Sequence, residues 1–315
     1  MKQPFLCICL IVMYCSVLKG HSDLKSVKTE GVHFITLKNG YKVWTQTVGE
    51  GPIQILLLHG GPGCTHEYFE CFENFLQKDQ FTLIYYDQLG SHYSDQPEDS
   101  SLWTVERFCE EVEEVRGALG LENFYLYGQS WGGLLAIEYA LKYQNHLKGL
   151  ILSNITGSVA SYENYLNELR RQLPQEVQDQ MASYEKAGEY GHPEYEKILF
   201  EKVYTRFLCR LDPWPEPLVR TFSHLNKQVY LTIQGPNEFV VTGNFKEWNR
   251  WADLPKIQVS TLLICGRYDT MNPKDVEQMA SLIPHSQLKI CENGSHCCHY
   301  DDQESYFQAL RTFLK

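Results

Sequence analysis

Three residues of the chain have the types and the order that an acyl-transfer site requires. Ser130 lies in the segment Gly-Gln-Ser-Trp-Gly at residues 128–132, and Asp269 and His296 follow it along the chain. A serine hydroxyl needs a base to accept its proton, and that base needs a carboxylate to orient it. We therefore predict Ser130 as the nucleophile, His296 as its base and Asp269 as the orienting acid.

The sequence around Ser130 predicts a sharp turn between a strand and a helix. The apolar run 124–127 precedes the serine, and a helical pattern follows over residues 132–144. Glycines on both sides let strand and helix pack closely, and the serine oxygen then stands at a helix N-terminus, where developing negative charge is favoured. The alternative is a glycine-rich turn with an incidental serine, which this strand and helix context disfavours.

A second glycine-rich segment, His-Gly-Gly-Pro-Gly at residues 59–63, follows the apolar run 53–58. Consecutive glycines allow the backbone to approach a ligand closely. Such a loop supplies one backbone N–H for the oxyanion, and the residue after the nucleophile supplies the other. We assign these two donors to Gly61, with Gly60 as the alternative, and to Trp131.

The acid and the base are chosen from their positions relative to predicted strands. Asp269 follows the buried run 261–265, and the carboxyl ends of parallel strands are where such sites form. His296 follows an Asn-Gly-Ser loop that can turn its ring inward, whereas His299 lies three residues later and is the rival base. We favour His296.

Strands and helices alternate over most of the chain, which favours an α/β fold with a mostly parallel sheet and helices on both faces. The strand-like runs are 53–58, 81–86, 124–127, 150–152 and 261–265, and the helical stretches are 66–78, 104–119, 132–144, 274–282 and 303–314. Before them, Asn39-Gly40 separates the alternating runs 31–38 and 41–47 and predicts a hairpin with a two-residue turn.

This alternation stops after residue 155 and resumes at about 257. Residues 156–255 carry charge-rich, helix-like segments punctuated by prolines. We predict a core built from residues 21–155 and 256–315, with a helical cap at 156–255 inserted between them. A second independent domain is the alternative, but the last strand and helix are too short to fold alone.

Composition excludes some classes of function. The net charge of −11 and the lack of a basic patch argue against a nucleic-acid partner. No Cys-x-x-Cys pair occurs beyond residue 20, so no zinc site is predicted, and the proposed chemistry needs no metal or cofactor. Among the eleven cysteines, a Cys291–Cys297 bridge is conceivable, but free buried thiols are favoured.

The first twenty residues combine a lysine, a short apolar run and a small residue at the end, as a secretory signal does. We expect residues 1–20 to be a signal peptide and the protein to be secreted or periplasmic, with no stable membrane association after cleavage. An uncleaved membrane anchor is the alternative. Glycosylation sequons stand at Asn154 and Asn293, and a glycan on Asn293 would crowd His296.

Four motifs, together with the contexts of Asp269 and His296, carry a family resemblance: residues 59–63, 86–91 (Tyr-Asp-Gln-Leu-Gly-Ser), 128–133 and 235–239 (Gly-Pro-Asn-Glu-Phe). On these residues the chain resembles the prolyl aminopeptidases (proline iminopeptidases), which are serine peptidases of the α/β-hydrolase superfamily. It is particularly similar to the tricorn-associated archaeal type and to related amino-acid amidases. The resemblance covers about residues 31–315 and implies the α/β-hydrolase fold with an inserted cap. It also implies release of an N-terminal residue, preferably proline, from short peptides with a free N-terminus.

The resemblance also implies how substrate is bound. Glu238 matches the cap glutamate that binds the terminal ammonium, and a carboxylate there would fix how far the substrate enters. Its neighbours Asn237 and Phe239, and Gly60 in the glycine-rich loop, are expected to contact substrate. Trp131, Phe239 and Trp248 could line a pocket for a pyrrolidine ring or belong to the core.

One departure from the family pattern bears on specificity. Relatives of the archaeal type often carry a second glutamate directly after the catalytic aspartate, whereas this chain has Thr270 there. Hydrolysis is still expected, but the strictness of the proline preference is left open. The alternatives are an amino-acid amidase or esterase of the same fold and, from another class, a non-catalytic ligand receptor on a hydrolase scaffold.

Overall fold

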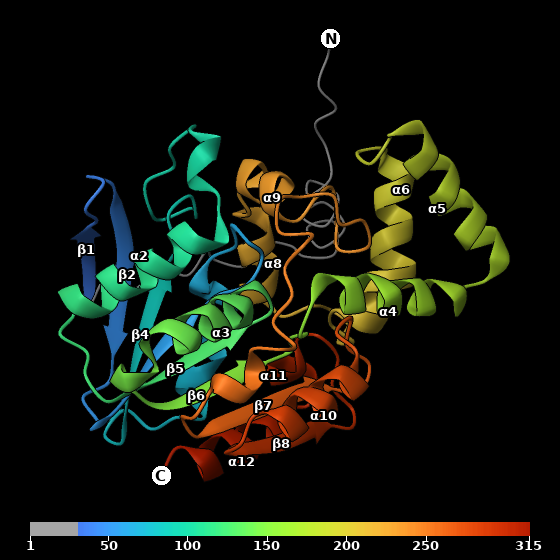
Figure 1. Ribbon diagram of the computed structural model, residues 1–315. Helices are drawn as coiled ribbons and strands as arrows, with labels where there is room; N and C mark the ends of the chain where they lie inside the picture. Colours follow the sequence, from blue (N-terminus) through green and yellow to red (C-terminus); the bar gives the residue numbers. More distant parts are fainter. Residues whose placement is uncertain (1–30) are drawn as a thin grey trace.

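The computed structural model describes residues 31–315, and an eight-stranded sheet runs through its centre (Figure 1). The strand order is β1-β2-β4-β3-β5-β6-β7-β8. β2 pairs antiparallel with β1 and β4, and the remaining neighbours pair in parallel. The prediction of a mostly parallel sheet is therefore confirmed. The strands are β1 Val32–Thr36, β2 Lys42–Val48, β3 Ile53–Leu58, β4 Phe81–Asp87, β5 Phe124–Gln129, β6 Leu147–Ser153, β7 Thr261–Gly266 and β8 Ser286–Cys291.

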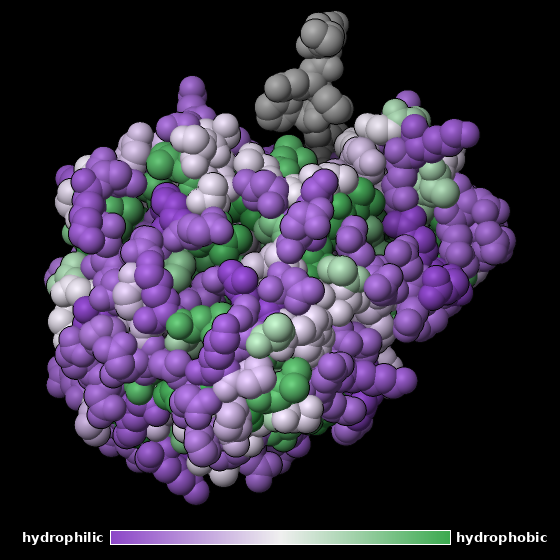
Figure 2. Space-filling model, in the orientation of Figure 1, coloured by the Kyte–Doolittle hydropathy of each residue, from purple (hydrophilic) through white to green (hydrophobic). Residues whose placement is uncertain are grey.

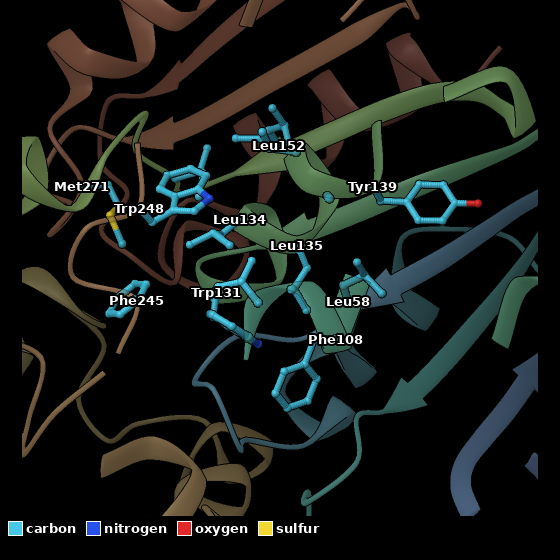
Figure 3. Close-up of a cluster of buried hydrophobic side chains, with 14 of the residues drawn as sticks. Leu58, Phe108, Trp131, Leu134, Leu135, Tyr139, Leu152, Phe245, Trp248 and Met271 are labelled. Atoms are coloured by element: carbon cyan, nitrogen blue, oxygen red, sulfur yellow. The ribbon is translucent and has the colours of Figure 1, made fainter. Parts of the chain in front are cut away.

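Helices cover both faces of this sheet because its central strands are apolar on both sides. In β3, Leu56 and Leu58 pack into one core cluster, while the alternate residues Ile55 and Leu57 pack into the other. Figure 3 shows part of the first cluster, where Leu58 lies among side chains from neighbouring helices. The first cluster is closed by α2 Val105–Ala118, α3 Trp131–Tyr143 and α10 Pro273–Leu282, and the second by η1 His66–Asn74 and α12 Gln303–Phe313.

One local prediction is wrong. The β1–β2 connection is not a two-residue turn, because only Gly40 has a positive φ (89°), and the loop closes through a bond from the Leu37 N–H to the Tyr41 carbonyl. This matches the longer hairpin loops that end on a glycine. The helical stretch predicted at 66–78 is present, as a 3₁₀ helix that ends at Asn74. Its first residue is held by tertiary contacts, since both the backbone and the ring of His66 bond to Asp87.

The segment between β6 and β7 is helical where the inserted cap is predicted, and Figure 1 shows α4, α5 and α6 projecting to one side of the sheet. Its helices are α4 Val159–Arg171, α5 Gln175–Ala187, α6 Pro193–Ile198, the π helix η4 Leu199–Tyr204, α7 Thr205–Phe207, α8 Glu216–Ser223, α9 Lys227–Ile233 and the 3₁₀ helix η5 Leu254–Lys256. The remaining short helices are η2 Ser100–Leu102, η3 Gln144–His146 and α11 Cys298–Asp301.

A buried carboxylate ties the inserted segment to the core. Glu67 of η1 is 2% exposed and pairs with Arg220 of α8 at 2.7 Å and with His224, just after α8, at 2.8 Å. Thr65 adds a hydrogen bond from its N–H to Thr221 Oγ1 at 3.0 Å. Burial opposes ionisation of Glu67, but hydrogen bonds from His224 and Thr65 outweigh it and lower its pKa to about 2. These contacts fix α8 beside the glycine-rich loop.

All eight cysteines within residues 31–315 are buried and free, so the conceivable Cys291–Cys297 bridge is not formed. Within the same part of the chain, no helix combines the length and apolar character that a membrane crossing requires. The predicted signal peptide at residues 1–20 lies outside the described residues.

Candidate active site

Ser130 occupies a strained turn between β5 and α3. Its backbone has φ 55° and ψ −124°, a combination that a residue with a side chain rarely adopts, and its N–H bonds to the Ser153 carbonyl at 3.0 Å. The flanking glycines are required by packing. A Cβ on Gly128 would lie 2.2 Å from the Gly132 oxygen, and one on Gly132 would lie 2.1 Å from the Leu58 oxygen. The predicted strand, turn and helix are therefore present, and they are held by backbone contacts.

Asp269 and His296 meet from the loops that follow β7 and β8. His296 Nδ1 lies 2.7 Å from Asp269 Oδ1, which also accepts the Met271 N–H at 3.0 Å. Asp269 is fully buried and His296 is 5% exposed. His296 lines the same cavity as Ser130, so the structure brings together the three residues that the sequence predicts.

The two candidate bases have opposite electrostatic surroundings. Burial lowers the pKa of His296, but the charge and hydrogen bond of Asp269, aided by the charge of Glu238, outweigh it and raise the pKa above its ordinary value of 6.5. His299 packs among aromatic rings, including that of Tyr68. Burial, reinforced by the nearby His296, lowers the pKa of His299 to about 3. His299 also lines neither of the two cavities described below, so its surroundings do not suit a rival base.

Asn154 is a site residue that sequence reasoning missed. It is fully buried directly after β6, and its Nδ2 donates to Asp269 Oδ2 at 2.6 Å and to the Ser295 carbonyl at 3.2 Å. Its Oδ1 accepts bonds from Ser153 and Cys298. The amide thus holds the acid and the histidine loop together, and the folded protein offers no access for a glycan at this sequon. Its position after a buried strand was the available signal.

A second missed set of residues links the predicted oxyanion loop to the histidine. The Gly60 N–H donates to Tyr68 Oη at 2.6 Å, and that hydroxyl donates to Gln129 Oε1 at 2.9 Å. Gln129 Nε2 in turn donates to the His296 carbonyl at 3.1 Å. The amide of Gly60 is committed to Tyr68, and this favours Gly61 as the donor to an oxyanion.

Two cavities meet at Ser130. The larger has a volume of about 590 Å³ and is lined by Ser130, His296 and residues of the helical segment. The smaller, of about 30 Å³, has an apolar wall that includes Trp131, Leu134, Phe245, Trp248 and Met271. Figure 3 shows these five side chains gathered in one region beside α3. Ser130, Gly61 and Glu238 line both cavities, so the reacting atoms of a ligand would lie at their junction.

Glu238 presents a half-buried carboxylate at this junction. Tyr162 donates its hydroxyl to the carboxylate and also contacts the Glu238 carbonyl at 2.9 Å, while Tyr230 donates to Oε2 at 3.4 Å. Both partners are neutral hydroxyls, and no cation of the described residues pairs with this carboxylate. The Glu238 carboxylate can therefore accept further hydrogen bonds from a cationic group.

Asn237 and Phe239, the neighbours of Glu238 that are expected to contact substrate, lie in different surroundings. Asn237 lines the large cavity, but its side chain bonds to Tyr195 Oη at 3.0 Å and to the Phe239 N–H at 2.9 Å, so it shapes the loop. Phe239 is 7% exposed, packs in the core and lines neither cavity. The ring of Phe239 therefore lies in the core, away from both cavities, and this position does not favour the expected contact with substrate. Phe245 lies in the small cavity instead, beside Trp248.

Thr270 lies behind the acid and base and is fully buried. Its Oγ1 is 3.3 Å from His296 Nδ1 and 3.4 Å from Asp269 Oδ1. The position after Asp269 therefore supports the histidine pair and offers no carboxylate to a ligand. Gly60, which is expected to contact substrate, lines the large cavity.

Across residues 31–315 no cluster of three or more His, Cys, Asp or Glu side chains has a metal-binding arrangement.

Comparisons with known proteins agree with this geometry. A family model described as alpha/beta hydrolase fold matches residues 54–303. The chain is 45% identical over 280 residues to a proline iminopeptidase of Elizabethkingia meningoseptica, covering 87% of this chain and 94% of the relative. It is 44% identical over 278 residues to a proline iminopeptidase of Flavobacterium johnsoniae, with the same coverage. The crystal structure of a Mycobacterium smegmatis proline iminopeptidase superposes with a TM-score of 0.82 at 30% identity, covering 90% of this chain and 97% of that one.

Proposed function

This chain belongs to the proline iminopeptidase family of α/β hydrolases, and on that premise we propose that it is a serine hydrolase that removes N-terminal proline from peptides. The observation that carries the proposal is the place of Ser130 and Glu238 together at the junction of the two cavities. A free amino terminus held by the carboxylate would place the first carbonyl of the substrate beside the serine.

The proposed reaction is acyl transfer through Ser130. His296 accepts the hydroxyl proton as the serine oxygen bonds to the substrate carbonyl, and the N–H groups of Gly61 and Trp131 stabilise the oxyanion. The intermediate collapses when the C–N bond breaks and His296 gives the proton to the leaving amine. Water then attacks the acyl-enzyme with His296 again as base, which releases proline and restores Ser130. Asp269 stabilises the imidazolium that forms in each step.

Specificity in this proposal comes from charge and shape. Glu238 binds the terminal ammonium through charge-assisted hydrogen bonds and sets how far the peptide enters the cavity. Peptide bonds in the interior of a longer chain are therefore not cleaved. The wall of the small cavity around Trp131 and Trp248 is apolar, as a site for the carbon atoms of a pyrrolidine ring requires. We further propose that the site is of the tricorn-associated archaeal kind in its use of a cap glutamate, with the second glutamate replaced by Thr270.

The test is a panel of chromogenic substrates. We expect proline β-naphthylamide to be hydrolysed faster than the alanine derivative, and N-blocked proline derivatives to be nearly inert. Ser130→Ala should lower kcat by about 10⁴-fold or more. Full activity in that variant would overturn the assignment of the nucleophile, and efficient turnover of blocked esters would favour an amidase or esterase. Failure of a fluorophosphonate probe to label the wild type would favour a non-catalytic receptor.

We also propose that the protein is secreted or periplasmic, with residues 1–20 removed as a signal peptide. Support comes from the pattern of a lysine at position 2, a short apolar run and a closing Lys-Gly pair. Sequencing the N-terminus of the protein isolated from its host should give a first residue near 21. An intact N-terminus in a membrane fraction would support the anchored alternative.

A further inference from the structure

Glu196 is a buried carboxylate on the wall of the large cavity. It lies on α6, is 4% exposed, and neither of its carboxylate oxygens has a hydrogen-bond partner among the described residues. Buried polar groups are almost always hydrogen-bonded, so a buried carboxylate with no hydrogen bond to either oxygen requires an explanation. The preceding residue, Tyr195, is bonded to Glu185 and Asn237, so the backbone that carries Glu196 is well held.

The carboxylate oxygens of Glu196 are able to accept hydrogen bonds from a ligand, because no described residue donates to them. Burial raises its pKa to about 8, and the charge of Lys227 on α9 acts in the opposite direction. No ion pair joins these two side chains within the described residues. Glu238, by contrast, receives hydroxyls from Tyr162 and Tyr230. A cationic group placed against Glu196 would supply both missing donors and favour the ionised carboxylate.

The two cavities indicate which part of a peptide would reach Glu196. Ser130 and Glu238 line both cavities, whereas His296 and Glu196 line only the large one. If the small cavity takes the first residue, the leaving group lies in the large cavity, on the side of the histidine that must protonate it. Glu196 therefore faces the leaving group and not the terminal ammonium.

The walls of the large cavity suit a long side chain with an apolar stem. Leu199, Phe200 and Leu231 line it together with Glu196. Figure 2 shows hydrophobic side chains gathered on the surface between the α8–α9 region and α6 of Figure 1. Lysine and arginine bury their methylene stems along such surfaces and present the charge at the end.

We propose that Glu196 is a specificity residue for the peptide's second position, where it binds the cationic side chain of lysine or arginine. The proposal rests on the proposed function, because it assigns the large cavity to the leaving group of an aminopeptidase. The enzyme then prefers peptides that begin with proline followed by a basic residue.

The test compares three substrates that differ only at the end of the second side chain: prolyl-lysinamide, prolyl-acetyllysinamide and prolyl-norleucinamide. In the wild type we expect kcat/KM for the lysine substrate to exceed the other two by about tenfold, because a charge-assisted pair forms in a buried place. In Glu196→Gln this ratio should fall to near one. The ratio is measured within one preparation, so a change in the folded fraction cancels.

Glu194→Gln is the matched control. Glu194 lies on the same helix, is exposed and does not line the cavity, so its substitution removes the same charge at a distance. This variant should keep the wild-type lysine preference. Equal loss in both variants would mean that the preference reflects net charge, and that outcome would overturn the role of Glu196.

The remaining outcomes separate this inference from the proposed function. Hydrolysis of all three amides without a lysine preference in the wild type, or a preference that survives Glu196→Gln, overturns the inference alone. Equal preference for lysine and acetyllysine over norleucine also overturns it, because a protonated carboxyl would then be binding a neutral group. Failure to cleave any prolyl amide or proline β-naphthylamide overturns the proposed function itself.

Discussion

The core side and the cap side of the site use their hydrogen bonds differently. On the core side, both oxygens of Asp269 accept bonds, from His296 and Met271 at one and from Asn154 at the other. On the cap side, Glu238 has only tyrosine hydroxyls and Glu196 has no partner among the described residues. The acid–base pair proposed for chemistry is held in place by hydrogen bonds, whereas the carboxylates proposed for recognition keep hydrogen-bonding capacity that a substrate can fill.

His296 and His299 lie three residues apart, and their rings also differ in hydrogen bonding and in pKa. Asp269 raises the pKa of one ring above its ordinary value, while burial lowers that of the other to about 3. Residue type and loop position therefore do not decide which histidine can exchange protons at neutral pH. The partner at Nδ1 decides it.

The largest expected effect comes from removing the charge of Asp269, which is bonded to His296 on the core side of the site. Asp269→Asn removes the charge that stabilises the imidazolium and permits the wrong tautomer of His296, so kcat for proline β-naphthylamide should fall by about 10⁴-fold. Asn154 and Met271 should still hold the loop, and circular dichroism with thermal melting would check the fold. Activity within tenfold of the wild type would show that another group orients the histidine.

A smaller effect is expected from the cap side at Glu238. Glu238→Gln keeps the shape but removes the charge, so kcat/KM should fall by about 10²-fold, mainly through a higher KM, as expected for the loss of a buried charge-assisted bond. Exposed Glu247, in the same inserted segment, provides the control variant Glu247→Gln. If kcat falls and KM stays, the carboxylate acts on the chemical step and not on binding.

The smallest expected effect is on the pH dependence of activity, because the charge of Glu238 on the cap side influences the pKa of His296 on the core side. The reaction needs neutral His296, whose pKa lies above 6.5, so kcat/KM should fall as the pH drops through a value higher than 6.5. Glu238 contributes to that elevation, and Glu238→Gln should move the acid limb to lower pH by about a few tenths of a unit. An acid limb at or below 6.5 in the wild type, or one unmoved by the substitution, would contradict this electrostatic link.

Much of the fold follows from local sequence patterns. Continuous apolar runs predict β3, β4, β5 and β7, because strands buried on both faces need no polar side. The loop after β1 is different, because it is longer than the two-residue turn that Asn39-Gly40 predicts. Local patterns also do not indicate the bonds from His66 to Asp87 that hold the start of the helix at His66–Asn74. Such bonds join residues far apart and leave no pattern in a short window of sequence.

By itself, the sequence determined the turn at Ser130. Gly128 and Gly132 lie so close to neighbouring backbone atoms that a side chain would not fit, and this pair of glycines is visible within five residues of sequence. It also determined the order of Asp269 and His296 after strands that end at one edge of the sheet. Only the tertiary structure decided that Asn154 holds Asp269 across 115 positions of chain and that Phe239 lies in the core. It also decided that Glu196 is buried with no hydrogen-bond partner among residues 31–315. Burial and hydrogen-bond partnership depend on what the remote chain packs against each side chain, and that is fixed only when the whole molecule folds.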